Sequence, residues 1–122
     1  MLLQSMYAAW AEGAAELRRV AATLDDARRL AAERQAGVGE WHARTVRTAI
    51  NLRRGYAAFV AGDRVGLIAA ARDEYANAMA SLSLVEADSR LGWEPSMEYA
   101  AGPEQIRWKL GLMERLYGKE LK

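Results

Sequence analysis

Apolar residues recur every three or four positions along most of this 122-residue chain. That spacing places them on one face of an α-helix. The first such segment covers about residues 5–35, and its apolar face includes Met6, Trp10 and Leu17. Charged residues of both signs fill the other positions, which is typical of a solvated helix surface. Because Gly37 is a suitable residue to end a helix, we expect the first helix to stop just before it.

A second helix is expected over about residues 40–61. One stripe of this segment includes Trp41, Leu52, Tyr56 and Phe59, and further apolar residues widen it. A wide apolar arc on a helix indicates contact with more than one neighbouring element. The pattern therefore predicts that two other helices bury this face.

The chain then turns at Gly62 and Asp63, where glycine can end one helix and aspartate can cap the next. A third helix is expected over 63–88, so that the second and third helices form an antiparallel hairpin. Glycines and prolines make 89–103 an irregular connection, and a fourth helix is expected over 103–118. The last four residues are expected to fray.

These elements predict an all-α fold. Three long helices and a shorter fourth would form an antiparallel up-and-down bundle, with one irregular connection at about residues 89–103. A chain of this length favours one domain over 1–122.

Composition then removes several classes of function. The chain has 17 Lys and Arg against 16 Asp and Glu, no cysteine, and one histidine, His42. A near-neutral charge argues against nucleic-acid binding, and the residue types exclude disulfides, thiol catalysis and zinc fingers. No apolar run reaches the roughly 18 residues of a membrane span, and no signal peptide is recognised. We therefore expect no metal, cofactor, nucleic acid or membrane partner, and a cytoplasmic location by default.

The strongest polar pattern lies on the second helix, where Arg44, Arg47, Asn51 and Arg54 share one stripe. Arginine forks bind carboxylates and phosphates, so this stripe is a candidate ligand or partner site. A structural interpretation is also available, because residues whose numbers sum to about 125 face each other in an antiparallel hairpin. Salt bridges between the helices would then occupy the arginines. The facing residues on the third helix are Asp73, Glu74 and Asn77.

A second candidate surface lies in the irregular connection. Trp93 stands beside Gly92 and near Arg90, Glu94 and Tyr99. An aromatic residue with adjacent charges can stack on a sugar ring or on a partner's peptide. The alternative is that the aromatic residues fold inward as a lid over the end of the bundle.

No complete catalytic constellation is present. His42 has no serine, cysteine or aspartate at a spacing that would make a triad, and we expect it to be a solvated or hydrogen-bonded helix residue. A di-iron bundle needs two Glu-x-x-His pairs, which a single histidine cannot supply. We therefore assign no catalytic residue.

Several runs resemble the helical C-terminal region of some large bacterial proteins related to glycoside hydrolases. They are residues 47–52, 73–77, 84–99 and 106–109, and the resemblance covers about residues 41–110. It implies that catalysis belongs to a separate barrel domain, and that the helical part packs against this domain or lines the edge of its sugar site. Since this chain contains no barrel, it is either an excised accessory domain or similar only as helical bundles are to one another.

The leading hypothesis is a non-catalytic helical accessory or interaction domain, associated with a carbohydrate-active enzyme. Its partner would be a larger enzyme domain, another protein or a carbohydrate. One rival is a small ligand-binding or enzymatic bundle with an internal polar pocket. The residues that would converge on this pocket are Arg47, Asn51, Asp73, Asn77, Glu86 and Asp88. Another rival is a homo-oligomeric scaffold that associates through an exposed patch of Leu2, Leu3, Met6, Leu112 and Leu116. The candidate contact residues are Arg47, Asn51, Arg54, Asp73, Asn77, Arg90, Trp93, Glu94 and Tyr99.

Overall fold

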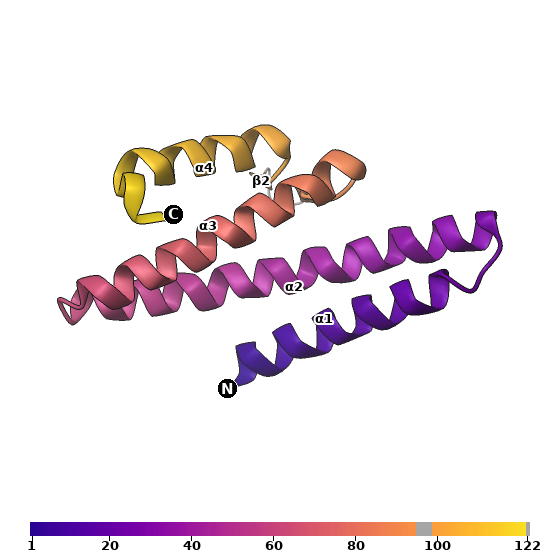
Figure 1. The fold of residues 1–122 in the computed structure, drawn as a ribbon, viewed down its shortest axis with the longest axis horizontal. Coiled ribbons are helices and arrows are strands. Elements are labelled where there is room, and N and C mark those ends of the chain that lie inside the picture. The colour runs from indigo at the N-terminus through magenta and orange to yellow at the C-terminus, as the bar shows by residue number, and fades with distance from the viewer. Residues whose placement is uncertain (95–98, 122) are drawn as a thin grey trace. The chain divides into compact units, whose positions relative to one another are not determined.

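The structure, a computed structural model, describes residues 1–94 and 99–121. Its elements follow one another as shown in Figure 1. They are α1 (Leu2–Ala21), α2 (Asp26–Val60), α3 (Arg64–Ala87), the strands β1 (Trp93–Glu94) and β2 (Tyr99–Ala100), α4 (Pro103–Tyr117) and the 3₁₀ helix η1 (Gly118–Leu121). The all-α prediction of three long helices and a shorter fourth is confirmed. Among the described helices, none has the length and apolar character that crossing a membrane requires.

The predicted boundary between the first two helices is wrong. The first helix was expected to continue to about residue 35, but α1 ends at Ala21 and α2 begins at Asp26. Local capping explains the break, because the Asp25 carboxylate accepts a hydrogen bond from the backbone N–H of Arg28 (3.1 Å). Aspartate is favoured at this position since it satisfies an N–H group that the first turn leaves unpaired.

The expected helix end at Gly37 is wrong as well, because α2 runs through Gly37 and Gly39 without interruption. A Cβ at Gly39 would lie 3.3 Å from the Cβ of Ala14 on α1. Glycine here permits the backbones of α1 and α2 to approach closely, and this contact outweighs its low helix propensity.

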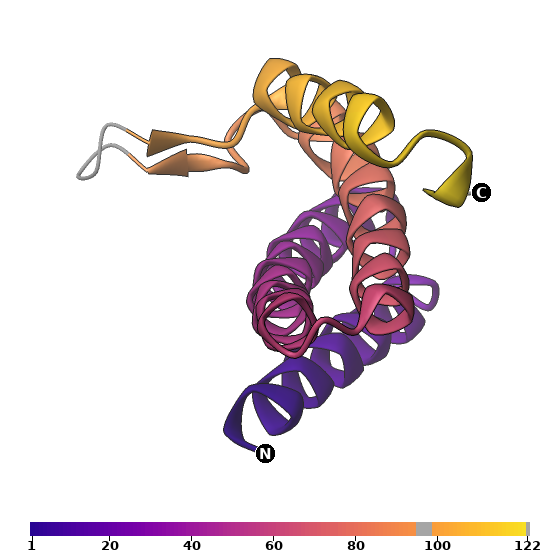
Figure 2. The ribbon, with the colours of Figure 1, turned by 90° about the vertical axis from the view of Figure 1, so that its left-hand side faces the viewer.

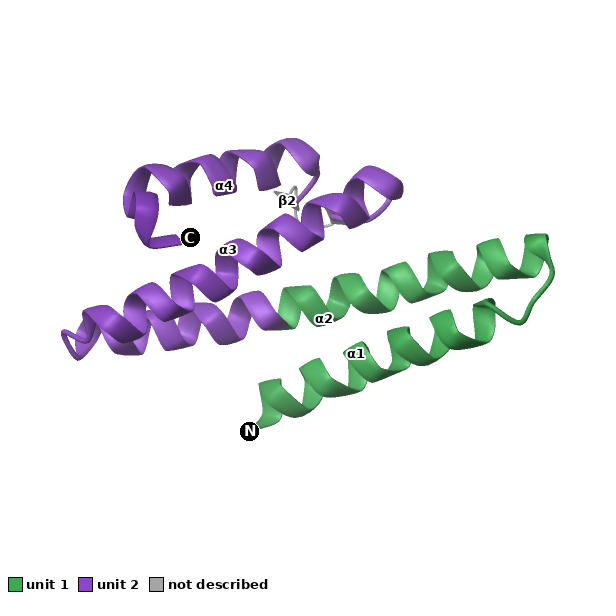
Figure 3. Ribbon diagram, viewed as in Figure 1, with its two compact units in different colours: residues 1–46 green, residues 47–122 purple. Residues whose placement is uncertain are grey.

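The chain divides into two compact units, Met1–Val46 and Arg47–Lys122, with the boundary inside α2 (Figure 3). The first unit is a hairpin of α1 and the beginning of α2. Small side chains form its buried positions, which brings the two helices close together. These residues are Ala14, Ala21, Ala36 and Ala43. The single domain expected over 1–122 stays a prediction.

The second unit contains the end of α2 together with α3, α4 and η1. The predicted turn between α2 and α3 is confirmed, since Gly62 has a φ of +69° and Asp63 accepts a hydrogen bond from the N–H of Gly66 (2.9 Å). Ala71 of α3 packs with Met113 of α4, and the partly buried Tyr75 and Tyr117 lie against them. The second unit therefore has its own small core.

The expected fraying of the last residues is wrong for those that the structure describes. Residues 118–121 form η1, and Leu121 is buried. The Glu120 carboxylate forms an ion pair with Arg64 (2.8 Å), and its backbone carbonyl accepts from Arg72 (2.5 Å). Contacts with α3 therefore hold the end of the chain.

The connection between α3 and α4 contains a short antiparallel pair of strands. Trp93 pairs with Ala100 and Glu94 with Tyr99. Figure 2 shows the two strands side by side, extending away from α3 and α4. Gly92 closes the pair with a φ of +81°, and a Cβ there would lie 2.4 Å from the carbonyl oxygen of Ala101. Only glycine fits this position without strain.

Candidate functional site

A buried carboxylate, Glu74, lies at the centre of the polar residues of the second unit. It sits on α3 and is 6% exposed. From α2 it accepts hydrogen bonds from the Thr48 hydroxyl (2.7 Å) and the Asn51 amide (2.9 Å). Lys109 of α4 forms an ion pair with it. One charged group thus ties three helices together, as burial of a carboxylate requires paired and hydrogen-bonded partners.

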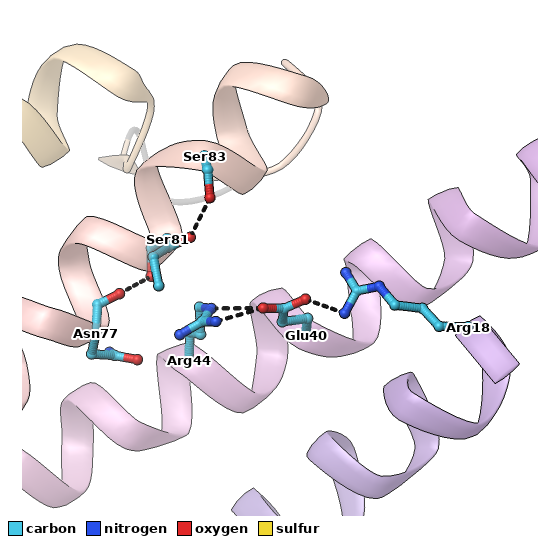
Figure 4. A network of polar contacts seen from close by, with 7 residues as sticks. Arg18, Glu40, Arg44, Asn77, Ser81 and Ser83 are labelled. Carbon is cyan, nitrogen blue, oxygen red and sulfur yellow. Dashed lines mark hydrogen bonds and ion pairs between the residues drawn. The ribbon is translucent and has the colours of Figure 1, made fainter.

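The buried amide of Asn77 extends this cluster along α3. Its nitrogen donates to the Thr48 hydroxyl (3.1 Å), and its backbone carbonyl accepts from the Ser81 hydroxyl (2.7 Å; Figure 4). Asn51 is 3% exposed, and its oxygen is the one buried side-chain acceptor without a hydrogen-bond partner among the described residues. The polar groups of the cluster therefore bind mainly to each other.

Asp73, the neighbour of Glu74, binds two of the predicted arginines. Its carboxylate is 3.2 Å from the guanidinium of Arg47 and 2.5 Å from that of Arg54. The predicted hairpin register is confirmed, because these residues face each other with numbers that sum to about 125. The salt-bridge interpretation is confirmed for Arg47 and Arg54, while a ligand role for the stripe stays a prediction.

Glu86 and Asp88 do not join the cluster. Glu86 is exposed and forms an ion pair with Arg107. Asp88 accepts hydrogen bonds from the Arg90 guanidinium (2.6 and 2.8 Å), and these bonds raise the pKa of Arg90. Both carboxylates lie at least three helical turns beyond Glu74 along α3, roughly 18 Å at 1.5 Å per residue. Glu86 and Asp88 therefore do not meet the other polar residues as the rival hypothesis of an internal pocket requires.

A second carboxylate bridge stabilises the first unit. Glu40 of α2 is 2.5 Å from both Arg18 of α1 and Arg44 of α2 (Figure 4). Partial burial opposes the charged form of Glu40, but the hydrogen bonds from Arg44 and Arg18 outweigh it and lower the pKa of the carboxyl. The charged form of Glu40 is therefore the one that the folded hairpin favours.

His42 belongs to the same hairpin. Its ring stacks on Trp10 with centroids 4.6 Å apart, and its Nδ1 donates to the Val38 carbonyl (2.9 Å). The expectation of a hydrogen-bonded helix residue is confirmed. The described residues contain no group of three or more metal-ligating side chains.

The structure describes only part of the aromatic surface that the sequence predicts in the connection between α3 and α4. Arg90 lies on the described chain and binds Asp88. The structure describes the backbone of Trp93, Glu94 and Tyr99 but not their side chains, and Met97 lies outside the described residues. Their roles as a recognition surface or as a lid stay predictions.

One exposed apolar feature of α2 consists of residues whose spacing predicts a buried face. Four side chains of α2 form what we call the α2 stripe, and their exposed fractions are 66% for Leu52, 72% for Tyr56, 69% for Phe59 and 67% for Val60. Their predicted burial by two helices is wrong. The α2 stripe has the same spacing of three and four residues as a buried helix face. Periodicity alone therefore does not distinguish an exposed apolar face from a buried one.

Small residues, and not the large apolar residues of the stripe, form the contact between α2 and α3. A Cβ at Gly55 of α2 would lie 3.7 Å from the Cβ of Ala70, and one at Gly66 of α3 would lie 3.3 Å from the Cβ of Ala58. Because α2 meets α3 through small and polar positions, its large apolar residues point elsewhere.

Comparisons with known proteins supply no relative: no family model, curated protein or solved structure matches the chain.

Proposed function

We propose that this chain is a non-catalytic helical interaction domain that binds another protein through the α2 stripe. The observation that carries this proposal is the exposure of Leu52, Tyr56 and Phe59 on successive turns of one helix. Scattered apolar side chains are ordinary on protein surfaces, whereas a contiguous apolar patch is typical of an interaction site. Tyrosine and phenylalanine are also enriched in protein interfaces.

The polar cluster supports the non-catalytic part of the proposal. A catalytic carboxylate needs access to a substrate, but Glu74 is enclosed by groups that already bind it. Asp73 is likewise shared between two arginines. Such mutual pairing suits a role in setting helix register, a well-attested use of buried polar residues.

The resemblance to the helical region of glycoside-hydrolase-like proteins adds a more specific proposal for the partner. In that case the chain is an accessory domain beside a larger carbohydrate-active domain, with Trp93 near the sugar. Titration of the wild type and of Trp93→Ala with neutral and acidic oligosaccharides tests this association. A saturable fluorescence change that is lost in Trp93→Ala supports it, and the same change in both proteins contradicts it.

Site-specific photo-crosslinking tests the interaction domain itself. A photoreactive phenylalanine analogue at position 56 is compared with the same analogue at position 79, because Met79 is also exposed but lies on α3. We expect a saturable crosslink at position 56 alone, in cells of the source organism. Excess unlabelled wild type should compete for it, whereas excess Leu52→Ser/Phe59→Ser protein should not. Equal crosslinking at both positions, or competition by both proteins, would contradict the proposal.

A further inference from the structure

The α2 stripe has the dimensions of a site for one helix. Its residues stand at positions i, i+4, i+7 and i+8 of α2, so they cover about two turns, roughly 12 Å. Tyr56 and Phe59, exposed by 72% and 69%, together present roughly 200–350 Å², given roughly 150–250 Å² for an aromatic side chain, and Leu52 and Val60 add smaller areas. A stable dimer needs about 800 Å² from each partner. The stripe therefore suits a short amphipathic helix better than a second copy of the whole chain.

The segment of α2 that contains the stripe is basic in sequence. Residues 41–60 of α2 contain four arginines and no aspartate or glutamate. Three of these arginines face carboxylates, since Arg44 binds Glu40 and both Arg47 and Arg54 bind Asp73.

The fourth arginine, Arg53, lies at the edge of the stripe. It is exposed and precedes Tyr56 by three residues and Val60 by seven, so it shares their side of the helix. Among the described residues, no carboxylate is within ion-pair distance of its guanidinium. A helix seated on the stripe would bring its own flanking side chains next to this charge.

We infer that the α2 stripe binds an amphipathic helix of another protein that carries a carboxylate opposite Arg53. The partner's apolar residues, spaced by three and four, pack on Leu52, Tyr56 and Phe59, as the apolar faces of two amphipathic helices pack together. A second copy of this segment has no carboxylate to offer, and it would bring more arginines to the interface instead. This inference rests on the proposed function and adds the chemistry of the partner.

Two designed peptides provide the probes. Both are 18-residue helices with leucines at i, i+4 and i+7, and they differ only in having glutamates or lysines beside the leucines. Fluorescence polarisation measures their binding at low and at moderate salt. We expect the glutamate peptide to bind about three- to tenfold more tightly at low salt, with a smaller difference at moderate salt because exposed charges are screened.

Three variants test whether Arg53 causes the charge preference and whether the apolar stripe binds the peptides. Arg53→Glu should abolish or reverse the preference for the glutamate peptide. Arg34→Glu is the matched control, because Arg34 is also an exposed α2 arginine with no ion pair among the described residues, and it should retain the preference. Phe59→Ser should weaken both peptides. Circular dichroism checks that every variant remains helical.

Each other result contradicts the inference in a recognisable way. If both peptides bind equally and only Phe59→Ser weakens them, apolar docking stands and the acidic partner is excluded. If neither peptide binds, the inference fails, and the crosslink at position 56 decides the proposed function separately. If sedimentation shows a wild-type dimer that Phe59→Ser converts to a monomer, the occupant is a second copy of this chain.

Discussion

The two faces of α2 within the second unit reverse the usual distribution of residues. The face toward α3 contains small and polar residues, among them Thr48, Asn51 and Ala58, of which Asn51 and Ala58 are buried. The side of the helix next to this face carries Leu52 and Phe59, both about two-thirds exposed. Hydrophobicity alone would predict the other orientation. The difference shows that close helix approach and a satisfied carboxylate decide which face is inside, and it leaves an apolar face available to a partner.

Removing the central carboxylate tests the polar face most strongly. Glu74→Ala leaves the Asn51 and Thr48 donors and the Lys109 charge without their acceptor. We expect the free energy of unfolding to fall by about 2–3 kcal/mol, measured by urea denaturation. Glu104→Ala is the control, because Glu104 is exposed on α4. Equal losses in the two variants would show that the cluster does not stabilise the fold.

Enlarging a small residue tests the close approach of α2 and α3. Ala58→Leu adds bulk where Ala58 lies near Gly66, and overpacking of this kind costs about 1–3 kcal/mol. Ala57→Leu places the same side chain on the next, exposed position of α2 and should be nearly neutral. Thermal denaturation compares the two variants. If Ala57→Leu proves the more damaging, the assignment of the inner face is wrong.

Acid titration distinguishes the Glu40 bridge of the first unit from the polar face of the second. The folded protein lowers the pKa of Glu40, so its stabilisation is complete above the unfolded-state pKa and disappears as the pH falls through the folded-state pKa. Glu40→Gln should therefore cost about 1 kcal/mol near neutral pH and less at acid pH. Urea denaturation from pH 7 to pH 3 measures this. A constant difference across that range would contradict the charge-based explanation.

The stripe should show the smallest effect on stability. Phe59→Ser exchanges an exposed ring for a hydroxyl, so the free energy of unfolding should change by no more than about 0.5 kcal/mol. Chemical denaturation gives this value, and the crosslink at position 56 gives the effect on binding. A loss above about 2 kcal/mol, typical of a buried aromatic residue, would place Phe59 in a core.

Much of the fold could be predicted from particular residues. Gly62 and Asp63 identify a turn, and the facing of Arg47 and Arg54 with Asp73 follows from the hairpin that this turn makes. The central role of Glu74 was less visible. It was named only as one of several facing residues, because its burial depends on Lys109, which lies on a different helix and 35 residues away.

The sequence by itself determined the helical character of the chain, the α2–α3 hairpin and its register, since these follow from local periodicity and turn chemistry. Tertiary structure decided that Gly39 lies inside a helix and that Leu52, Tyr56 and Phe59 lie outside the core. The physical reason is that a period of 3.6 residues shows which residues share a face of a helix. Which of these faces is buried depends on the helices that pack against it.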